Sequence, residues 1–239
     1  GEAKSGQVNA VNEYNQKVQF IFNGLKTDGS SKLTSFDERI GDQTLSLERL
    51  AVSVEGKDLA ELTGMRIAGK STLTPDGKKI NSQLDYTLNN LKLQNQDFGS
   101  GQLTLKVDGI DGVAMHQFSQ QYQAQTQALM AQPDLAQNPE LYQQKAVDAL
   151  FSTLPILLKG DPVVTLSPLS WKNAKGESSL NLSLALKDPA QATGEATTLA
   201  QQVDRGVKSL DAKLSIPMDM ATELMSQVAR LEGYQQEDA

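Results

Sequence analysis

The sequence contains no cysteine, and it has one histidine (His116) and one tryptophan (Trp171) among its 239 residues. The missing thiols exclude disulfides, cysteine nucleophiles, iron–sulfur clusters and cysteine-based zinc sites. With a single imidazole, a Ser-His-Asp triad or a multi-histidine metal site would have to be built around His116 alone. The sequence therefore argues against several common enzyme chemistries without identifying an activity.

Long apolar runs and an excess of basic residues are also missing. The densest apolar stretch, residues 150–158, is far shorter than the roughly 18 apolar residues that a membrane-spanning helix needs. The chain has 22 Lys and Arg against 29 Asp and Glu, a formal net charge of −7. This balance opposes nonspecific nucleic-acid binding, which depends on clustered Lys and Arg. Because Gly1 is preceded by neither an initiator Met nor a signal peptide, we expect a fragment of a longer protein.

Residues 1–111 predict a β meander, because apolar and polar residues alternate with a period of two. The alternation is clearest in residues 18–22, 45–47, 50–54 and 103–107. Turn chemistry should separate the strands at Asp28-Gly29, Gly41-Asp42, Glu55-Gly56, 75–77 and 99–101. No helix-length gap falls between these runs, so neighbouring strands should be antiparallel.

Two segments, residues 45–52 and 86–93, share the irregular pattern apolar-x-apolar-x-x-apolar-x-apolar. In a regular strand the extra residue would move the later apolar side chains to the opposite face. A β-bulge or sharp bend would compensate for it and curve the sheet. The alternative is a long strand that leaves one core and enters another. Of the two, we favour the bulge.

Residues 112–160 predict a helical insertion. Asp111 can cap a Gln-rich helix that runs to about Met130, with one narrow apolar stripe. Asn138 and Pro139 predict the start of a second helix, which Pro155 should kink or end. Residues 161–217 should form a β hairpin, a short helix and a strand, and residues 218–239 a C-terminal helix with a frayed tail.

Together these segments predict one α+β domain over residues 1–239. We expect a curved, mostly antiparallel β-sheet meander with two to four helices packed on one face.

Few residues could carry catalysis. The acid nearest to His116 along the chain is Asp111, which is explained as a helix cap, so we interpret His116 as a structural or surface residue. Residues 108–111 resemble part of a calcium loop but lack the ligand spacing and closing Glu of an EF-hand. We predict no catalytic residue, no metal site and no cofactor.

The strongest apolar feature is the cluster at residues 150–158. It is either the end of a helix packed into the core or one wall of a groove between the helices and the curved sheet. The candidate groove residues are Phe118, Tyr122, Leu129, Leu150, Phe151, Leu154, Leu157 and Leu158.

Ten segments resemble the YdgA-like family of enterobacterial cell-envelope proteins, which has no defined activity. They are VNEYNQKVQ (11–19), LKTDGSS (25–31), KINSQLDY (79–86), GSGQLTLKV (99–107), HQFSQQY (116–122), LKGDPV (158–163), SWKNAKGES (170–178), DR (204–205), KSLDAKL (208–214) and PMDMATE (217–223). The similarity runs from about residue 3 to the end, and none of these segments is a catalytic signature.

The resemblance implies a periplasmic body that is associated with the inner membrane only through an N-terminal anchor, which this chain lacks. We expect a non-enzymatic scaffold or interaction module that self-associates, most simply as a dimer through unpaired sheet edges. The alternative is binding of lipid or another apolar ligand in the groove. Besides a second copy of the chain, the expected partner is a lipid or another envelope protein. A hydrolase activity is the hypothesis that we favour least.

Overall fold

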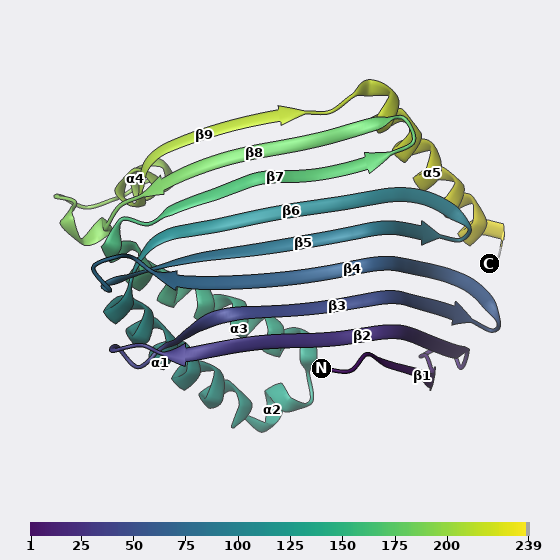
Figure 1. The fold of residues 1–239 in the computed structure, drawn as a ribbon, viewed down its shortest axis with the longest axis horizontal. Coiled ribbons are helices and arrows are strands. Elements are labelled where there is room, and N and C mark those ends of the chain that lie inside the picture. The colour runs from purple at the N-terminus through teal and green to yellow at the C-terminus, as the bar shows by residue number, and fades with distance from the viewer. Residues whose placement is uncertain (238–239) are drawn as a thin grey trace.

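The computed structural model describes residues 1–237 and contains one nine-stranded sheet and five α-helices (Figure 1). The strands lie side by side in chain order, and every neighbouring pair is antiparallel. The predicted fold class, a curved and largely antiparallel α+β fold, is confirmed. The helices exceed the expected two to four because Pro133–Ala136 forms a helical turn of its own.

The strands are β1 (Lys4–Val11), β2 (Lys17–Leu33), β3 (Arg39–Val54), β4 (Lys57–Leu73), β5 (Lys79–Leu93), β6 (Gln96–Asp111), β7 (Val163–Asn173), β8 (Gly176–Leu186) and β9 (Val207–Ser215). The helices are α1 (Gly112–Met130), α2 (Pro133–Ala136), α3 (Pro139–Thr153), α4 (Leu199–Gly206) and α5 (Met218–Glu237), with 3₁₀ segments η1 (Leu154–Gly160) and η2 (Pro189–Gln191). Of the tail expected to fray, residues 235–237 belong to α5, and residues 238–239 lie outside the described residues.

Three of the five predicted turns are wrong, because Asp28-Gly29, Gly41-Asp42 and residues 99–101 lie inside β2, β3 and β6. A side chain at Gly41 would overlap the carbonyl oxygen of Ser30, and one at Gly99 would overlap that of Lys172. These glycines therefore allow close approach between strands instead of reversing the chain. The turns at Glu55-Gly56 and at residues 75–77 are confirmed.

The predicted bulge is confirmed in residues 86–93, where the register of β5 against β6 shifts between Leu88 and Leu91. In residues 45–52 the register of β3 against β2 and β4 is unchanged, but the pairing is interrupted at Glu48. The neighbouring strands place Gly24 and Gly64 there, with φ of 69° and 65°. These left-handed conformations suit glycine, so the irregular pattern marks a bend shared by adjacent strands.

The helices α1, α2 and α3 form an insertion at one end of the strands (Figure 1). The predicted caps are confirmed: Asp111 accepts a hydrogen bond from the backbone N–H of Ala114, and Asn138 accepts one from that of Leu141. The helices α1 and α3 contact each other, and η1 contacts both α1 and β6. The insertion is therefore anchored to the sheet mainly where its ends leave and rejoin it.

The apolar core is small and lies where this insertion meets the sheet. Ile40, Ile80 and Ile110 are buried together there, and the residues packed against them are Phe36, Leu73, Val107, Met115 and Leu157. The chain exposes 15682 Å² of surface. A compact monomer of its 25.9 kDa mass would expose only about 10,500 Å². Much of the sheet is therefore uncovered.

Candidate functional site

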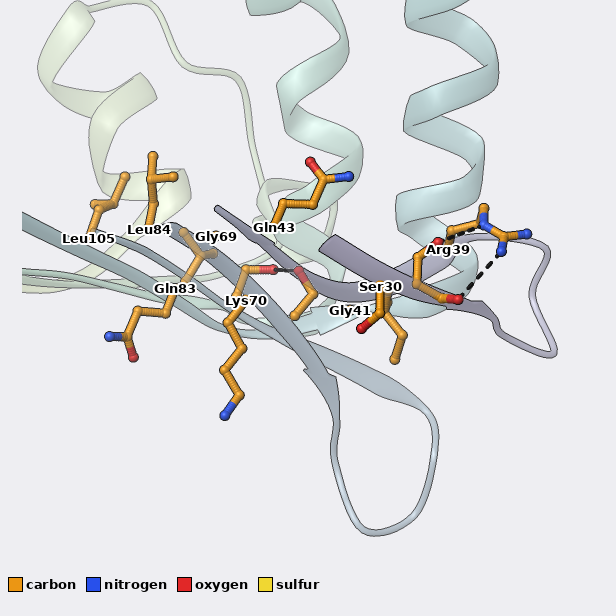
Figure 2. A pocket seen from close by; sticks show the side chains of 14 residues that line it. Ser30, Arg39, Gly41, Gln43, Gly69, Lys70, Gln83, Leu84 and Leu105 are labelled. Atoms are coloured by element: carbon orange, nitrogen blue, oxygen red, sulfur yellow. Dashed lines mark hydrogen bonds between the residues drawn. The ribbon is translucent and has the colours of Figure 1, made fainter. Parts of the chain in front are cut away.

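The two faces of the sheet differ sharply in polarity. Figure 2 shows Leu84 and Leu105 directed toward the side where the helices lie, whereas Lys70 and Gln83 point to the opposite side. Residues directly opposite each other in an antiparallel pair share a face, and side chains alternate along each strand. With these two rules, the pairing register shows on which face of the sheet each of the other strand residues lies.

The helix-side face carries apolar residues from β3 to β9, and we call these residues the apolar face. They are Leu45, Ile67, Leu84, Tyr86, Leu103, Leu105, Val107, Val164, Leu166, Leu169, Leu180, Leu182, Leu184, Leu210, Ala212 and Leu214. The opposite face is polar, as shown by the row Asp42, Lys70, Gln83, Lys106, Thr165, Ser183 and Asp211.

None of the residues of the apolar face is fully buried. Tyr86 is 38% exposed, Leu169 is 45% exposed and Leu214 is 64% exposed. In a sheet covered by a second layer, residues on the inner face are buried in the core between the layers. The apolar face is therefore only partly covered: Tyr86, Leu169, Leu210, Ala212 and Leu214 are exposed, and its other residues are half-buried. Contiguous exposed apolar residues of this kind mark binding surfaces more often than scattered ones do.

Two adjoining hollows, of about 470 and 520 Å³, lie over β2–β6, and both are lined by Ser30, Ser31, Gln43, Gly69 and Leu84. Gly69 leaves room in their shared floor, because a Cβ added there would meet only Leu84, at 4.0 Å. Figure 2 shows Leu84 close to Gly69 and Leu105 next to Leu84, both directed to the helix side. Each volume lies in the range of about 300–1,000 Å³ that is common for small-ligand sites.

The eight predicted groove residues are on the insertion, and none of them lines either hollow. Phe118, Tyr122 and Leu129 lie on α1, where the first two stack their rings at 5.9 Å between centroids. Leu150 and Phe151 lie on α3, and Phe151 is 66% exposed. Leu154, Leu157 and Leu158 lie in η1, where Leu157 packs against the isoleucine cluster.

The sequence patterns gave no indication of the residues that line the hollows on the sheet. The alternation at residues 103–107 and 180–186 did predict a strand face that is apolar on one side. The pattern could not indicate that this face would stay open, because covering it depends on where the helices pack. Gly69 gave no local signal, since it lies inside an otherwise ordinary strand.

Ionisable groups near the hollows do not form a catalytic arrangement. His116 Nδ1 lies 3.1 Å from Oε1 of Glu38, and this contact joins α1 to the β2–β3 turn. Neither residue lines a hollow. Asp28 lines one hollow, and its pKa is lowered mainly by a hydrogen bond from the N-terminal ammonium group. Within residues 1–237 no three or more His, Asp or Glu residues gather as a metal site would require. No helix in that range is long and apolar enough to cross a bilayer.

A family described as "Bacterial protein of unknown function (DUF945)" matches residues 1–239. Protein YdgA of Escherichia coli (strain K12) is 70% identical over 239 residues, which is all of this chain and 48% of that protein. The uncharacterized protein YihF of the same strain is 31% identical over 214 residues, 89% of this chain and 43% of YihF. The chain thus spans about half the length of these relatives. No solved structure matches.

Proposed function

The chain belongs to the DUF945 family of bacterial proteins of unknown function, and from that premise we propose that it binds an elongated apolar molecule, such as the acyl chain of a lipid. The ligand lies on the apolar face and begins in the hollows around Gly69. The role is binding, without catalysis. The observation that carries this proposal is an apolar face that stays partly exposed in the described chain, although Val107 packs against the core where the insertion meets the sheet.

The dimensions of the face suit a long, flexible chain. The strands β2–β6 have 15 to 17 residues and extend about 50 Å, longer than one extended acyl chain. Each buried methylene contributes about 0.8 kcal/mol. Branched residues such as Ile67, Leu84 and Leu105 line the hollows beside polar ones such as Ser30 and Gln43, so a ligand chain would bury its methylenes against the branched residues. Eight buried methylenes would therefore contribute about 6 kcal/mol, before the cost of immobilising the ligand.

A lipid-binding role fits the envelope location that the sequence resemblance implied. We include that location in the proposal: the periplasm, with association to the inner membrane through a part of the longer protein. Fractionation of cells that express the full-length protein tests it, and a cytoplasmic pool would contradict it.

Native mass spectrometry of the gently purified chain tests the binding proposal. We expect bound species heavier than the polypeptide by the mass of a lipid, and organic extraction should remove them. A fluorescent fatty acid, dansyl-undecanoic acid, should then bind the extracted protein. The same two measurements should be made on the full-length protein. If it showed neither a lipid adduct nor probe binding, the remainder of the longer protein would cover the apolar face, and the proposal would be contradicted.

Filling the hollow should block the same site. Gly69→Leu places a branched side chain on the apolar face, and we expect it to weaken probe binding at least fivefold, or about 1 kcal/mol, by occupying ligand space. Ala68→Leu is the matched control, because it adds similar bulk to the next residue, on the polar face. Equal binding by both variants would place the ligand elsewhere.

Self-association is a second candidate function, and the open sheet favours it. The outermost strands, β1 and β9, are not joined to each other, so the sheet retains two edges within the described residues. Exposed edges present unpaired backbone groups that can add a further strand. A scaffold built in this way could also bind lipid, since edge pairing leaves the apolar face free.

A further inference from the structure

The strand β9 has a self-complementary sequence. Residues 209–215 read Ser-Leu-Asp-Ala-Lys-Leu-Ser, and reversing their order only exchanges Asp211 with Lys213. β9 pairs with β8 along one edge and is the last strand of the sheet. Its other edge has no partner in the described part of the chain, as Figure 1 shows along the top of the sheet.

We propose that this edge pairs antiparallel with β9 of a second copy, centred on Ala212. The inference rests on the self-association proposed above and specifies its surface and register. Ala212 then lies opposite the partner's Ala212, and the two sheets continue into each other across a two-fold axis. Such an interface is isologous and closes at two copies, so it yields a dimer and no filament.

The proposed register matches apolar residues on one face. Leu210 lies opposite the partner's Leu214, and by symmetry Leu214 lies opposite the partner's Leu210. Both leucines belong to the apolar face and are 57% and 64% exposed. Directly opposite side chains are about 5 Å apart, so each leucine covers its counterpart and the apolar face continues across the dimer.

The same register matches charges on the other face. Asp211 lies opposite the partner's Lys213, which creates two symmetric ion pairs. In β8 these residues face only the neutral Ser183 and Asn181. Neither takes part in an ion pair among the described residues. Their charges are therefore available to a second copy.

Two other registers that keep the apolar faces together oppose like charges. Centring the pair on Asp211 places that carboxylate opposite its own copy, and centring it on Lys213 opposes two ammonium groups. Centring it on Leu210 places Lys208 opposite the partner's Ala212. Like charges directly opposite each other destabilise a pair, so the registers centred on Asp211 and Lys213 are disfavoured. Of the registers centred on a residue from Leu210 to Leu214, only the one on Ala212 places Asp211 opposite Lys213 in both symmetric positions.

Cysteine cross-linking tests the register, because the native chain has no thiol. Ala212→Cys should form a disulfide-linked dimer under mild oxidation, since opposite Cα atoms lie about 5 Å apart. Ser215→Cys alone should not, because the two copies of that position would be about 20 Å apart. Oxidising a mixture of the Ser209→Cys variant and the Ser215→Cys variant should give a disulfide between one chain of each, because positions 209 and 215 lie opposite each other in this register. Circular dichroism checks that each variant keeps the fold.

Charge reversal tests the ion pairs. Asp211→Lys and Lys213→Asp should each weaken dimerisation about tenfold, because each opposes like charges twice. Mixing these two variants should restore dimerisation, since every introduced charge then meets its opposite. Light scattering coupled to size exclusion, up to about 100 µM, provides the measurement.

Two results overturn the proposal in distinguishable ways. Dimers that do not cross-link at position 212 and are insensitive to charge reversal would disprove the register and leave self-association standing. A strict monomer for the native chain and for the Ala212→Cys variant would disprove both. Probe binding to the apolar face is measured separately, and neither result affects it.

Discussion

Leu105→Glu should lower the affinity for dansyl-undecanoic acid about 30-fold, a loss of about 2 kcal/mol. Leu105 lies on the apolar face and lines the hollow beside Leu84. A carboxylate at this position would have to lose water beneath an apolar chain, with no partner to compensate for it. Because the position is only half-buried in the free protein, the fold should tolerate the charge.

Lys106→Glu is the matched control for this variant. Lys106→Glu changes the net charge by more than Leu105→Glu does, because it replaces a positive charge by a negative one. The change lies at the next residue of β6, on the polar face of the sheet. Fluorescence titration should find its affinity for the probe close to that of the native chain. A comparable loss in both variants would mean that overall charge, and not the apolar face, governs binding of the anionic probe.

Gly99→Ala should destabilise the chain by about 3 kcal/mol. Gly99 has a φ of 99°, a conformation in which a Cβ costs about 1–2 kcal/mol. The added methyl would also overlap the carbonyl oxygen of Lys172 and approach the Cα of Asn173 to 3.0 Å. Backbone cannot rotate away as a side chain can, so β6 and β7 must separate, at a further cost of about 1–3 kcal/mol.

Gly56→Ala separates these two causes. Gly56 also has a positive φ, 76°, but a Cβ there would meet nothing within 4 Å. We expect this control to cost only about 1 kcal/mol. Urea unfolding followed by circular dichroism measures both variants. If the two urea midpoints fall by the same amount, the overlap with β7 adds nothing to the destabilisation caused by Gly99→Ala.

Most of the features of the fold that could be predicted from the sequence were predicted from strand periodicity and helix caps. The alternation in residues 103–107 defines which side of β6 is apolar, and Asp111 and Asn138 begin the helices that they were expected to cap. These signals are local, because they depend on side-chain direction and on nearby backbone donors. The irregular pattern at residues 86–93 likewise predicted the bulge in β5.

Glycine was the main source of error, since its local signal is ambiguous. The same residue type serves a turn at Gly56 and close strand approach at Gly41 and Gly99. Only the neighbouring strand distinguishes these roles, and that strand is distant in sequence. The result is strands of 15 to 17 residues where shorter ones were expected.

The candidate site depended on tertiary structure for a related reason. The sequence indicated apolar residues on the insertion, including Phe118 and Phe151, as a candidate groove, and that groove stays a prediction. The hollows lie elsewhere, over the sheet around Gly69 and Leu84. Whether an apolar surface is core or site depends on what covers it, and no local pattern records that.

By itself, the sequence determined the antiparallel meander, the polarity of the two sheet faces, the helix starts and the absence of thiol and multi-histidine chemistry. These properties follow from side-chain alternation, capping and composition, which act over a few residues. Only the tertiary structure decided that, within residues 1–237, most of the apolar face stays partly exposed and β9 is the last strand of the sheet. Both depend on the packing of segments far apart in the chain, where the insertion meets the sheet at one end and leaves the rest uncovered.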